Sequence, residues 1–234
     1  MNAGDETLDA MPDRSEAVRL VIVCTGSINA AFLPWSIGWL RTRAPQIDFR
    51  LVLTRSASRF VSPDALSVIA ARPVQTDAWP ETFTTAPHVE LAEWADAFAV
   101  YPASAHYLAR LAAGLADTPS LLALQCTNAP VAVAPALPEG LWETKLMQRH
   151  VATITERDNV TVVCPEPGRS WTTGRQSLAI PPPFPRVLRR LLHRLAVGAA
   201  DTHGTDGTEG ATEACSQKPG RESRPNQKGT DPCP

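Results

Sequence analysis

The residues best suited to chemistry lie between Pro87 and Tyr107, in the segment PHVELAEWADAFAVYPASAHY. His88 opens this segment, an apolar strand follows, and the small residues from Pro102 to Ala105 form a loop at its end. Small residues at the carboxyl end of a parallel strand let a ligand approach backbone N–H groups and a hydroxyl. A histidine at the same edge can exchange protons near neutral pH. The segment therefore predicts a ligand site with acid–base chemistry, although a lone histidine is more often structural.

Two other loops carry hydroxyl groups in a similar position. In the first, Gly26 permits a tight turn, and the hydroxyls of Thr25 and Ser27 accompany the N–H groups of a helix start, which suits a phosphate. The second loop, from Thr54 to Phe60, adds guanidinium groups that favour an oxyanion or a polar ring edge. An ordinary capped turn and a solvated turn have the same residue types, so both alternatives stay open for each loop.

The composition limits the class of protein. The chain has 234 residues, 44% of them hydrophobic, with a formal net charge of −2. It can bury a sizeable core and offers no broad electrostatic case for nucleic acid or an acidic membrane. No apolar run reaches the ~20 residues of a membrane span, and the N-terminal residues lack a secretion signal, so a cytoplasmic protein is expected. The five cysteines lack metal-ligand spacing and are expected to be reduced thiols.

Strand and helix patterns alternate along the middle of the chain. Apolar runs of the kind that form strands covered on both faces predict strands at 19–25, 49–54, 97–101, 131–134 and 160–164. Helices are expected at 28–43, from Ser62, and at 104–116, 141–157 and 186–195. Ser62-Pro63-Asp64 combines a capping hydroxyl, a first-turn proline and an acid at the positive end of the helix dipole. The alternation predicts an α/β fold with a mostly parallel sheet and helices on both faces.

The two ends of the chain have a different composition from the middle. Residues 1–17 are polar and are expected to be a disordered leader. Residues 196–234 contain no aromatic residue and almost no large aliphatic one, so they bury too little apolar surface to offset their ordering entropy. They are expected to be a disordered tail, which leaves a single domain at 18–195.

Five motifs, in the right order over about residues 18–180, resemble those of the homo-oligomeric flavin-containing cysteine decarboxylases. Gly26-Ser27-Ile28 resembles the phosphate turn of that family, and Thr54 to Phe60 resembles its T-x-x-A-x-x-F segment. The block from His88 to Asp96 resembles its His-x-x-Leu-x-x-Trp-Ala-Asp block. Pro102-Ala103-Ser104-Ala105 matches four residues of its Pro-Ala-Ser-Ala-Asn-Thr motif. Pro135 to Trp142 resembles its Pro-x-Met-Asn-x-x-Met-Trp block and keeps the first proline and the tryptophan.

This resemblance implies a three-layer, Rossmann-like flavoprotein that binds FMN and assembles as a trimer or as a dodecamer of trimers. His88 is implied as the active-site base, and no metal is implied. Leu137 and Trp142 are implied as part of a flap over the substrate. The implied contacts of FMN are Gly26, Ser27, Ile28, Thr54, Ser56, Phe60, Pro102, Ala103 and Ser104.

Three departures from the family pattern bear on the substrate. His106 replaces an asparagine that helps to bind the substrate carboxylate, a role that a protonated imidazole can also fill. Pro138 replaces a second asparagine and has neither an amide side chain nor an N–H group. Residues 168–174 lack the reactive cysteine of the coenzyme A branch, and Cys164, a few residues earlier, is expected to be a buried thiol. The missing cysteine favours the peptide-modifying branch, whose product remains an enethiol.

The leading hypothesis is therefore an FMN-dependent oxidative decarboxylase of a C-terminal cysteine, with His88 and His106 as catalytic residues. Its partners are expected to be a ribosomally made precursor peptide of the lanthipeptide type, further copies of the chain and other peptide-modifying enzymes. The product is an aminoenethiol for S-aminovinyl-cysteine formation, and the flavin carries the redox step. The alternatives are a phosphopantothenoylcysteine decarboxylase, a flavin prenyltransferase relative, or a non-catalytic flavoprotein subunit of a peptide-modifying complex.

Overall fold

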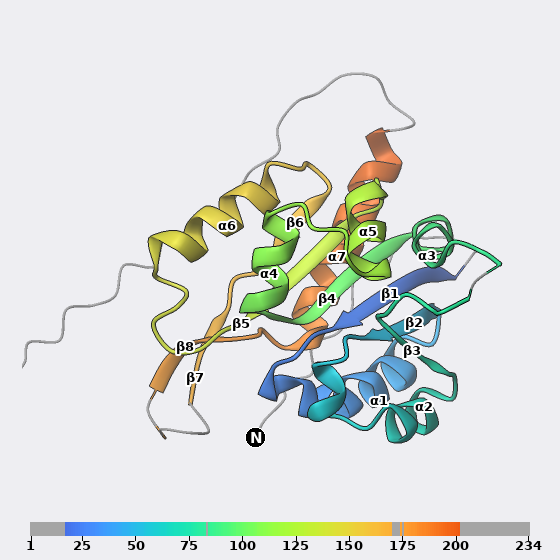
Figure 1. Ribbon diagram of the computed structural model, residues 1–234, viewed down its shortest axis with the longest axis horizontal. Coiled ribbons are helices and arrows are strands. Elements are labelled where there is room, and N and C mark those ends of the chain that lie inside the picture. Colours follow the sequence, from blue (N-terminus) through green and yellow to red (C-terminus); the bar gives the residue numbers. More distant parts are fainter. Residues whose placement is uncertain (1–16, 83, 170–173, 175, 202–234) are drawn as a thin grey trace, which may run out of the picture.

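The computed structural model of the chain describes residues 17–82, 84–169, 174 and 176–201. Six strands form one parallel sheet in the order β3-β2-β1-β4-β5-β6 (Figure 1). In this doubly wound order the strand sequence reverses between β1 and β4, which is where such sheets bind ligands. The predicted α/β fold with a parallel sheet is confirmed. The strands are β1 (Val18–Cys24), β2 (Ile47–Leu53), β3 (Val74–Thr76), β4 (Ala97–Ser104), β5 (Val131–Ala136) and β6 (Val160–Val162).

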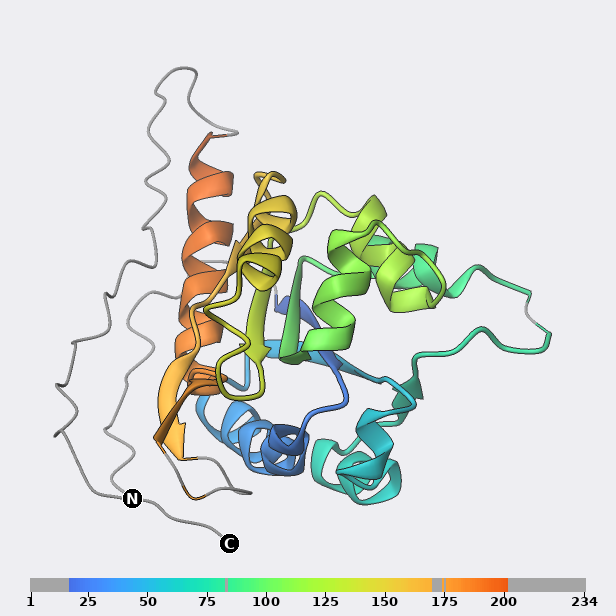
Figure 2. The ribbon, with the colours of Figure 1, turned by 60° about the vertical axis from the view of Figure 1, so that its left-hand side comes forward.

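Helices cover both faces of the sheet (Figures 1 and 2). One face packs against α1 (Leu33–Arg43), α2 (Pro63–Ala70) and α7 (Phe184–Asp201), and the 3-10 helices η1 (Ile28–Phe32) and η2 (Ala57–Arg59) lie on the same side. The other face packs against α3 (Pro87–Trp94), α4 (Ala105–Ala112), α5 (Pro119–Cys126) and α6 (Lys145–Thr155). A two-stranded antiparallel hairpin of β7 (Glu166–Arg169) and β8 (Gln176–Ile180) lies beside β5.

The central strand β1 is apolar from Leu20 to Cys24, and its packing shows why. Leu20, Ile22 and Cys24 point into the core cluster under α1 and α7, whereas Val21 and Val23 point into the cluster under α4 and α5. All five side chains are buried. Because side chains alternate across a strand and each large aliphatic group contributes about 1.5–3 kcal/mol on burial, a strand in the middle layer needs apolar residues wherever helices cover both of its faces.

Several boundaries differ from those that the sequence predicts. The predicted 28–43 helix is divided into η1 and α1, with Pro34 at the start of α1. α4 ends at Ala112 rather than at residue 116, just before Gly114 with its φ of 68°. α6 begins only at Lys145, because the Thr144 side chain accepts from the Met147 N–H as an N-cap. α7 continues to Asp201, past the predicted boundary at residue 195.

The main correction concerns the predicted loop from Pro102 to Ala105. Strand β4 continues through Ser104, with a cis Tyr101–Pro102 bond and a register shift against β5 between Val100 and Ala103. Helix α4 then begins at Ala105 without an intervening loop. The small residues therefore belong to a strand end that is fixed on both sides.

The prediction that the cysteines are all reduced is wrong for Cys164, which is partly buried and disulfide-bonded. Cys24 is buried and free, and Cys126 is exposed and free. In the described ranges, no group of three or more His, Cys, Asp or Glu side chains could hold a metal ion. None of the helices that the structure describes has both the length and the apolar character to cross a membrane. The predicted leader up to residue 16 and the predicted tail beyond residue 201 lie outside the described residues.

Candidate functional site

Thr25 joins the carboxyl ends of β1 and β4. Its buried hydroxyl donates to the Pro102 carbonyl at 2.7 Å and accepts from the Ser104 N–H at 2.7 Å. The Thr25 N–H also donates to the Pro102 carbonyl, at 3.2 Å. One side chain thereby satisfies the backbone on both sides of Ala103 and fixes the small-residue strand end against β1.

Thr54 joins the carboxyl ends of β2 and β1 in a similar way. Its N–H and its hydroxyl both donate to the Cys24 carbonyl, at 3.0 and 3.3 Å, and its hydroxyl lies 3.2 Å from the Ser56 hydroxyl. The two loops are so close that a Cβ on Gly26 would lie 2.5 Å from the Cβ and Oγ of Ser56. Glycine at position 26 is therefore required by the approach of the second loop.

Two helices begin beside these strand ends. Ser27 caps η1 by accepting from the Asn29 N–H at 3.3 Å, and Ser104 caps α4 by accepting from the Tyr107 N–H at 3.4 Å. Among the described residues, neither hydroxyl has an acceptor for its own hydrogen. The edge therefore offers hydroxyl donors, and the first backbone N–H groups of α4, to a negatively charged group.

His88 lies in the first turn of α3, half-buried, with its ring edge-on to Trp79 at a centroid distance of 5.7 Å. The buried Nδ1 atom of His88 has no hydrogen-bond partner in the described part of the chain. The Trp79 indole donates to the Asp117 carbonyl at 2.9 Å, and the Asp117 carboxylate accepts from Arg110 of α4. The structure thus places the His88 ring against Trp79.

His106 is exposed in the first turn of α4, one turn before Arg110. The pKa of Asp117 is lowered, mainly by the hydrogen bond from Arg110 and to a lesser degree by the nearby charge of His106. His88 and His106 therefore lie on either side of a group formed by Trp79, Arg110 and Asp117. This arrangement comes from tertiary packing and has no counterpart in the sequence motifs.

The segment after β5 is anchored at both ends. Leu137 is half-buried and packs against the core cluster under α4 and α6, and Trp142 belongs to that cluster with 8% of its surface exposed. The Gln148 side chain donates to the Trp142 carbonyl. Residues 138–140 between them are exposed, and Gly140 has a φ of 76°.

A buried polar chain, which sequence reasoning missed, holds α4 in place. The Tyr107 hydroxyl lies 2.7 Å from the Ser120 hydroxyl, which donates to the Asp77 carboxylate at 2.8 Å. The Ser120 N–H donates to the other Asp77 oxygen at 2.9 Å, and the Asp77 N–H donates to the Leu53 carbonyl at 2.7 Å. Burial, more than any other cause, raises the pKa of Tyr107 well above its usual value. Because 43 residues separate Asp77 from Ser120, no local pattern signals this pair.

Large apolar side chains are exposed beside the site loops. Trp35 is 83% exposed, and three neighbours along η1 and after η2 are 39–51% exposed. These neighbours are Ile28, Phe32 and Phe60. Two of them, Ile28 and Phe60, are among the predicted FMN contacts, and their exposure leaves their side chains available to a ligand or to another chain.

The comparisons with known proteins agree with this geometry. A family model described as Flavoprotein matches residues 9–177. The chain belongs to the flavoprotein family. It is 35% identical over 150 residues to the cypemycin cysteine dehydrogenase (decarboxylating) of a Streptomyces species, a match covering 63% of this chain and 77% of that protein. It is also 35% identical over 152 residues to the coenzyme A biosynthesis bifunctional protein CoaBC of Haemophilus influenzae, with 64% of this chain but only 37% of that protein covered.

Solved structures of decarboxylases share this flavoprotein fold. The FMN-dependent cysteine decarboxylase SpaF matches with a TM-score of 0.64 and 27% identity over 76% of this chain and 97% of that chain. The cypemycin decarboxylase CypD matches with a TM-score of 0.59 and 29% identity over 78% of this chain and 97% of that chain. The resemblance to the cysteine decarboxylases and the Rossmann-like fold are thus confirmed, and the prediction of a flavin cofactor is supported by the family.

Proposed function

We propose that this flavoprotein is a cytoplasmic enzyme that binds FMN at the carboxyl ends of β1, β2 and β4 and oxidatively decarboxylates the C-terminal cysteine of a ribosomally made precursor peptide. The observation that carries the proposal is the joining of three strand ends, β1 to β4 by Thr25 and β2 to β1 by Thr54, in a chain 35% identical to a decarboxylating cysteine dehydrogenase. The product is an aminoenethiol that can add to a dehydroamino acid, as in S-aminovinyl-cysteine formation.

The residues present fit FMN. The hydroxyl hydrogens of Ser27 and Ser104, which have no acceptor in the described part of the chain, and the start of α4 provide donors for the phosphate and for polar ring atoms. Ala103 and its neighbours Pro102 and Ser104 present only small side chains where a flat ring must approach the backbone. Ile28 and Phe60 provide exposed apolar surface beside them. Ser56 and Thr54 complete the phosphate side in this assignment.

FMN, when bound, supplies the two-electron oxidation of the substrate cysteine, after which carbon dioxide can leave. His88 is assigned the role of the base, because its buried Nδ1 atom has no partner among the residues that the structure describes and a base needs a free nitrogen. His106 is assigned to the substrate carboxylate, because an exposed imidazole at a helix start can donate a charge-assisted hydrogen bond when protonated. Residues 137–142 are assigned to exclude water, with Trp142 as a fixed anchor and residues 138–140 as the part free to move.

A second function has a specific observation in its favour. The chain is 35% identical to CoaBC of Haemophilus influenzae, a bifunctional protein of coenzyme A biosynthesis. In that case the substrate is phosphopantothenoylcysteine. Residues 168–174 contain no cysteine, so the chain lacks the thiol that the coenzyme A branch uses to reduce its enethiol. We therefore rank this substrate second.

The test offers the FMN-loaded protein two substrates, a set of peptides ending in cysteine and phosphopantothenoylcysteine, and measures their masses. The proposal predicts that a peptide loses carbon dioxide and two hydrogens, the equivalent of one formic acid. Turnover of phosphopantothenoylcysteine alone supports the second function. Failure of both substrates with flavin bound supports a non-catalytic subunit, and activity that appears only with a dehydratase partner places the chain in a peptide-modifying complex.

Two variants test the proposed roles of His88 and His106 in the same assay. His88→Gln should lower turnover by at least 100-fold, in the range expected for loss of a positioned base. His106→Asn should retain activity, because an amide can also donate a hydrogen bond to the substrate carboxylate. The matched control is His193→Gln, since His193 is exposed on α7, which covers the other face of the sheet. Full activity in His88→Gln removes His88 from the mechanism.

The oligomer belongs to the same proposal. Trp35, Ile28 and Phe32 form an exposed apolar group next to the site, and a trimer or a dodecamer of trimers would cover it. Trp35→Glu should shift the protein to a smaller species in analytical ultracentrifugation, whereas Val68→Glu on the exposed face of α2 serves as a control. A monomeric wild-type protein, or an unchanged assembly in Trp35→Glu, contradicts this part.

A further inference from the structure

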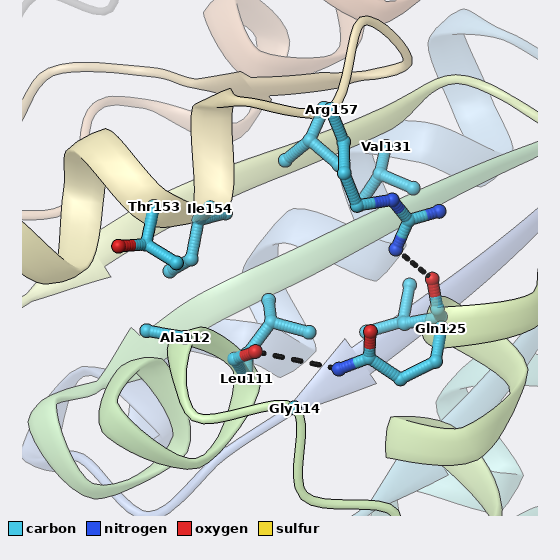
Figure 3. A pocket seen from close by; sticks show the side chains of 10 residues that line it. Leu111, Ala112, Gly114, Gln125, Val131, Thr153, Ile154 and Arg157 are labelled. Atoms are coloured by element: carbon cyan, nitrogen blue, oxygen red, sulfur yellow. Dashed lines mark hydrogen bonds between the residues drawn. The ribbon is translucent and has the colours of Figure 1, made fainter.

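A separate cavity lies at the amino ends of β5 and β6, where α4, α5 and α6 end (Figure 3). Its volume is about 160 Å³. Val131 and Val160, the first residues of the two strands, line it from the sheet. The proposed FMN edge lies at the opposite ends of the strands, so this cavity is no part of the site described above.

The cavity has an apolar body and a polar rim. Leu111, Leu124 and Ile154 join the two valines to form the body, and Ala112 leaves space that a larger residue would fill. The polar groups belong to Gln125, Thr153 and Arg157. Figure 3 shows Arg157 and Gln125 on one side of the cavity and Thr153 on the other. A cavity of about 150 Å³ with an apolar lining is large enough for benzene.

The carbonyl groups around the cavity are already paired. Arg157 donates to the Leu124 carbonyl at 2.5 Å and to the Thr127 carbonyl at 2.8 Å, and the Gln125 side chain donates to the Leu111 carbonyl at 3.3 Å. These bonds satisfy the ends of α4 and α5, where the helix dipole is negative. The guanidinium group of Arg157 is the charged group among the residues that line the cavity.

Arg157 has N–H donors and a positive charge that these carbonyl bonds do not use up. A guanidinium group has five N–H donors, and the two carbonyl bonds use two of them. Arg157 is half-buried, and within the described ranges no carboxylate forms an ion pair with it. A partly buried cation without an anion is costly, and an anion that brings its own apolar body into the cavity would relieve that cost.

We propose that this cavity binds a small apolar monocarboxylate, whose ring or branched chain fills the space between Leu111, Val131 and Ile154 and whose carboxylate pairs with Arg157. The volume limits the apolar part to about the size of one benzene ring. The charge of Arg157 selects the acid over its neutral analogue. Binding at this position does not require FMN or the peptide, so the proposal is independent of the proposed function.

Benzoate is the probe, and benzyl alcohol is its neutral counterpart. Titration calorimetry and saturation-transfer NMR with the full chain should show saturable benzoate binding at least tenfold tighter than that of benzyl alcohol. Ala112→Leu fills the cavity and should weaken benzoate binding at least tenfold without unfolding the protein. Ala113→Leu changes the exposed neighbouring residue and should leave benzoate binding unchanged.

Arg157→Gln tests the charge and should also weaken benzoate binding at least tenfold. If that variant does not fold, Arg157→Lys keeps a cation without the forked geometry and should weaken binding while the protein stays folded. Binding that is equal in Ala112→Leu and the wild-type protein overturns the proposal, as does equal affinity for benzoate and benzyl alcohol. The absence of saturable binding at tens of millimolar benzoate overturns it too and identifies the cavity as a space for water only.

Discussion

Replacing Thr25 by valine tests how the candidate site is held together. Valine has nearly the shape of threonine but lacks the hydroxyl that donates to the Pro102 carbonyl and accepts from the Ser104 N–H, both at 2.7 Å. The Pro102 carbonyl keeps the bond from the Thr25 N–H at 3.2 Å, whereas the Ser104 N–H loses the bond that it makes to Thr25. Leaving one donor unsatisfied and losing one further bond should cost about 2–3 kcal/mol of unfolding free energy.

Thr25→Ser is the matched control. Serine keeps both hydrogen bonds and loses one buried methyl group, which should cost about 1 kcal/mol. Urea unfolding followed by circular dichroism gives the two free energies, and flavin absorbance after dialysis gives FMN retention. Thr25→Val should lose most of its FMN, because the end of β4 is no longer fixed, and Thr25→Ser should retain it. If Thr25→Val equals Thr25→Ser in both stability and FMN retention, the hydroxyl does not organise the site.

Three further predictions concern groups near the same edge of the sheet. Gly26→Ala should destabilise the protein by about 1–3 kcal/mol and weaken FMN binding, because the new Cβ would lie 2.5 Å from Ser56. Adding Ser56→Gly should restore part of the stability and part of the FMN affinity. If the second substitution restores neither, the steric explanation is contradicted. Tyr107→Phe should cost about 1 kcal/mol in a urea titration, because the Ser120 hydroxyl loses the phenol; no change would show that this bond is not formed. Burial raises the pKa of Cys24 from 9.0 to about 12, so the folded chain keeps a proton that the unfolded chain releases between those values. The resulting stability is present below pH 9 and is lost as the pH rises toward 12. The wild-type protein should therefore lose more unfolding free energy over this range than Cys24→Ala. Parallel curves of unfolding free energy against pH for the two proteins would contradict the raised pKa of Cys24.

Strands β1, β4 and β5 were predictable because each one buries both of its faces over most of its length. Val21 and Ile22 point in opposite directions, and both are apolar, so the run signals a middle-layer strand without any knowledge of its neighbours. The start of α2 was predictable for a local reason as well, since the Ser62 side chain accepts from the Ala65 N–H as the sequence indicates. In these cases, the sequence signal lies within a few neighbouring residues.

The features that the sequence did not predict depend on contacts between distant segments. Pro102 to Ser104 have the composition of a loop, yet Thr25 and the pairing with β5 hold them in a strand. The placement of Asp77 against Ser120 and of His88 against Trp79 arises from packing between elements, which residue types cannot specify. The roles of the predicted FMN contacts stay predictions, although the structure brings Gly26, Ser56 and the end of β4 to one edge.

The measurement that tests the account most directly is a titration of the flavin-free protein with FMN. The account predicts saturation at one FMN per chain, and markedly weaker binding in Gly26→Ala, whose change is confined to the approach of the loops after β1 and β2. A protein that binds no FMN, or a Gly26→Ala variant that binds it as tightly as the wild-type protein, would contradict the claim that flavin lies at the carboxyl ends of these strands.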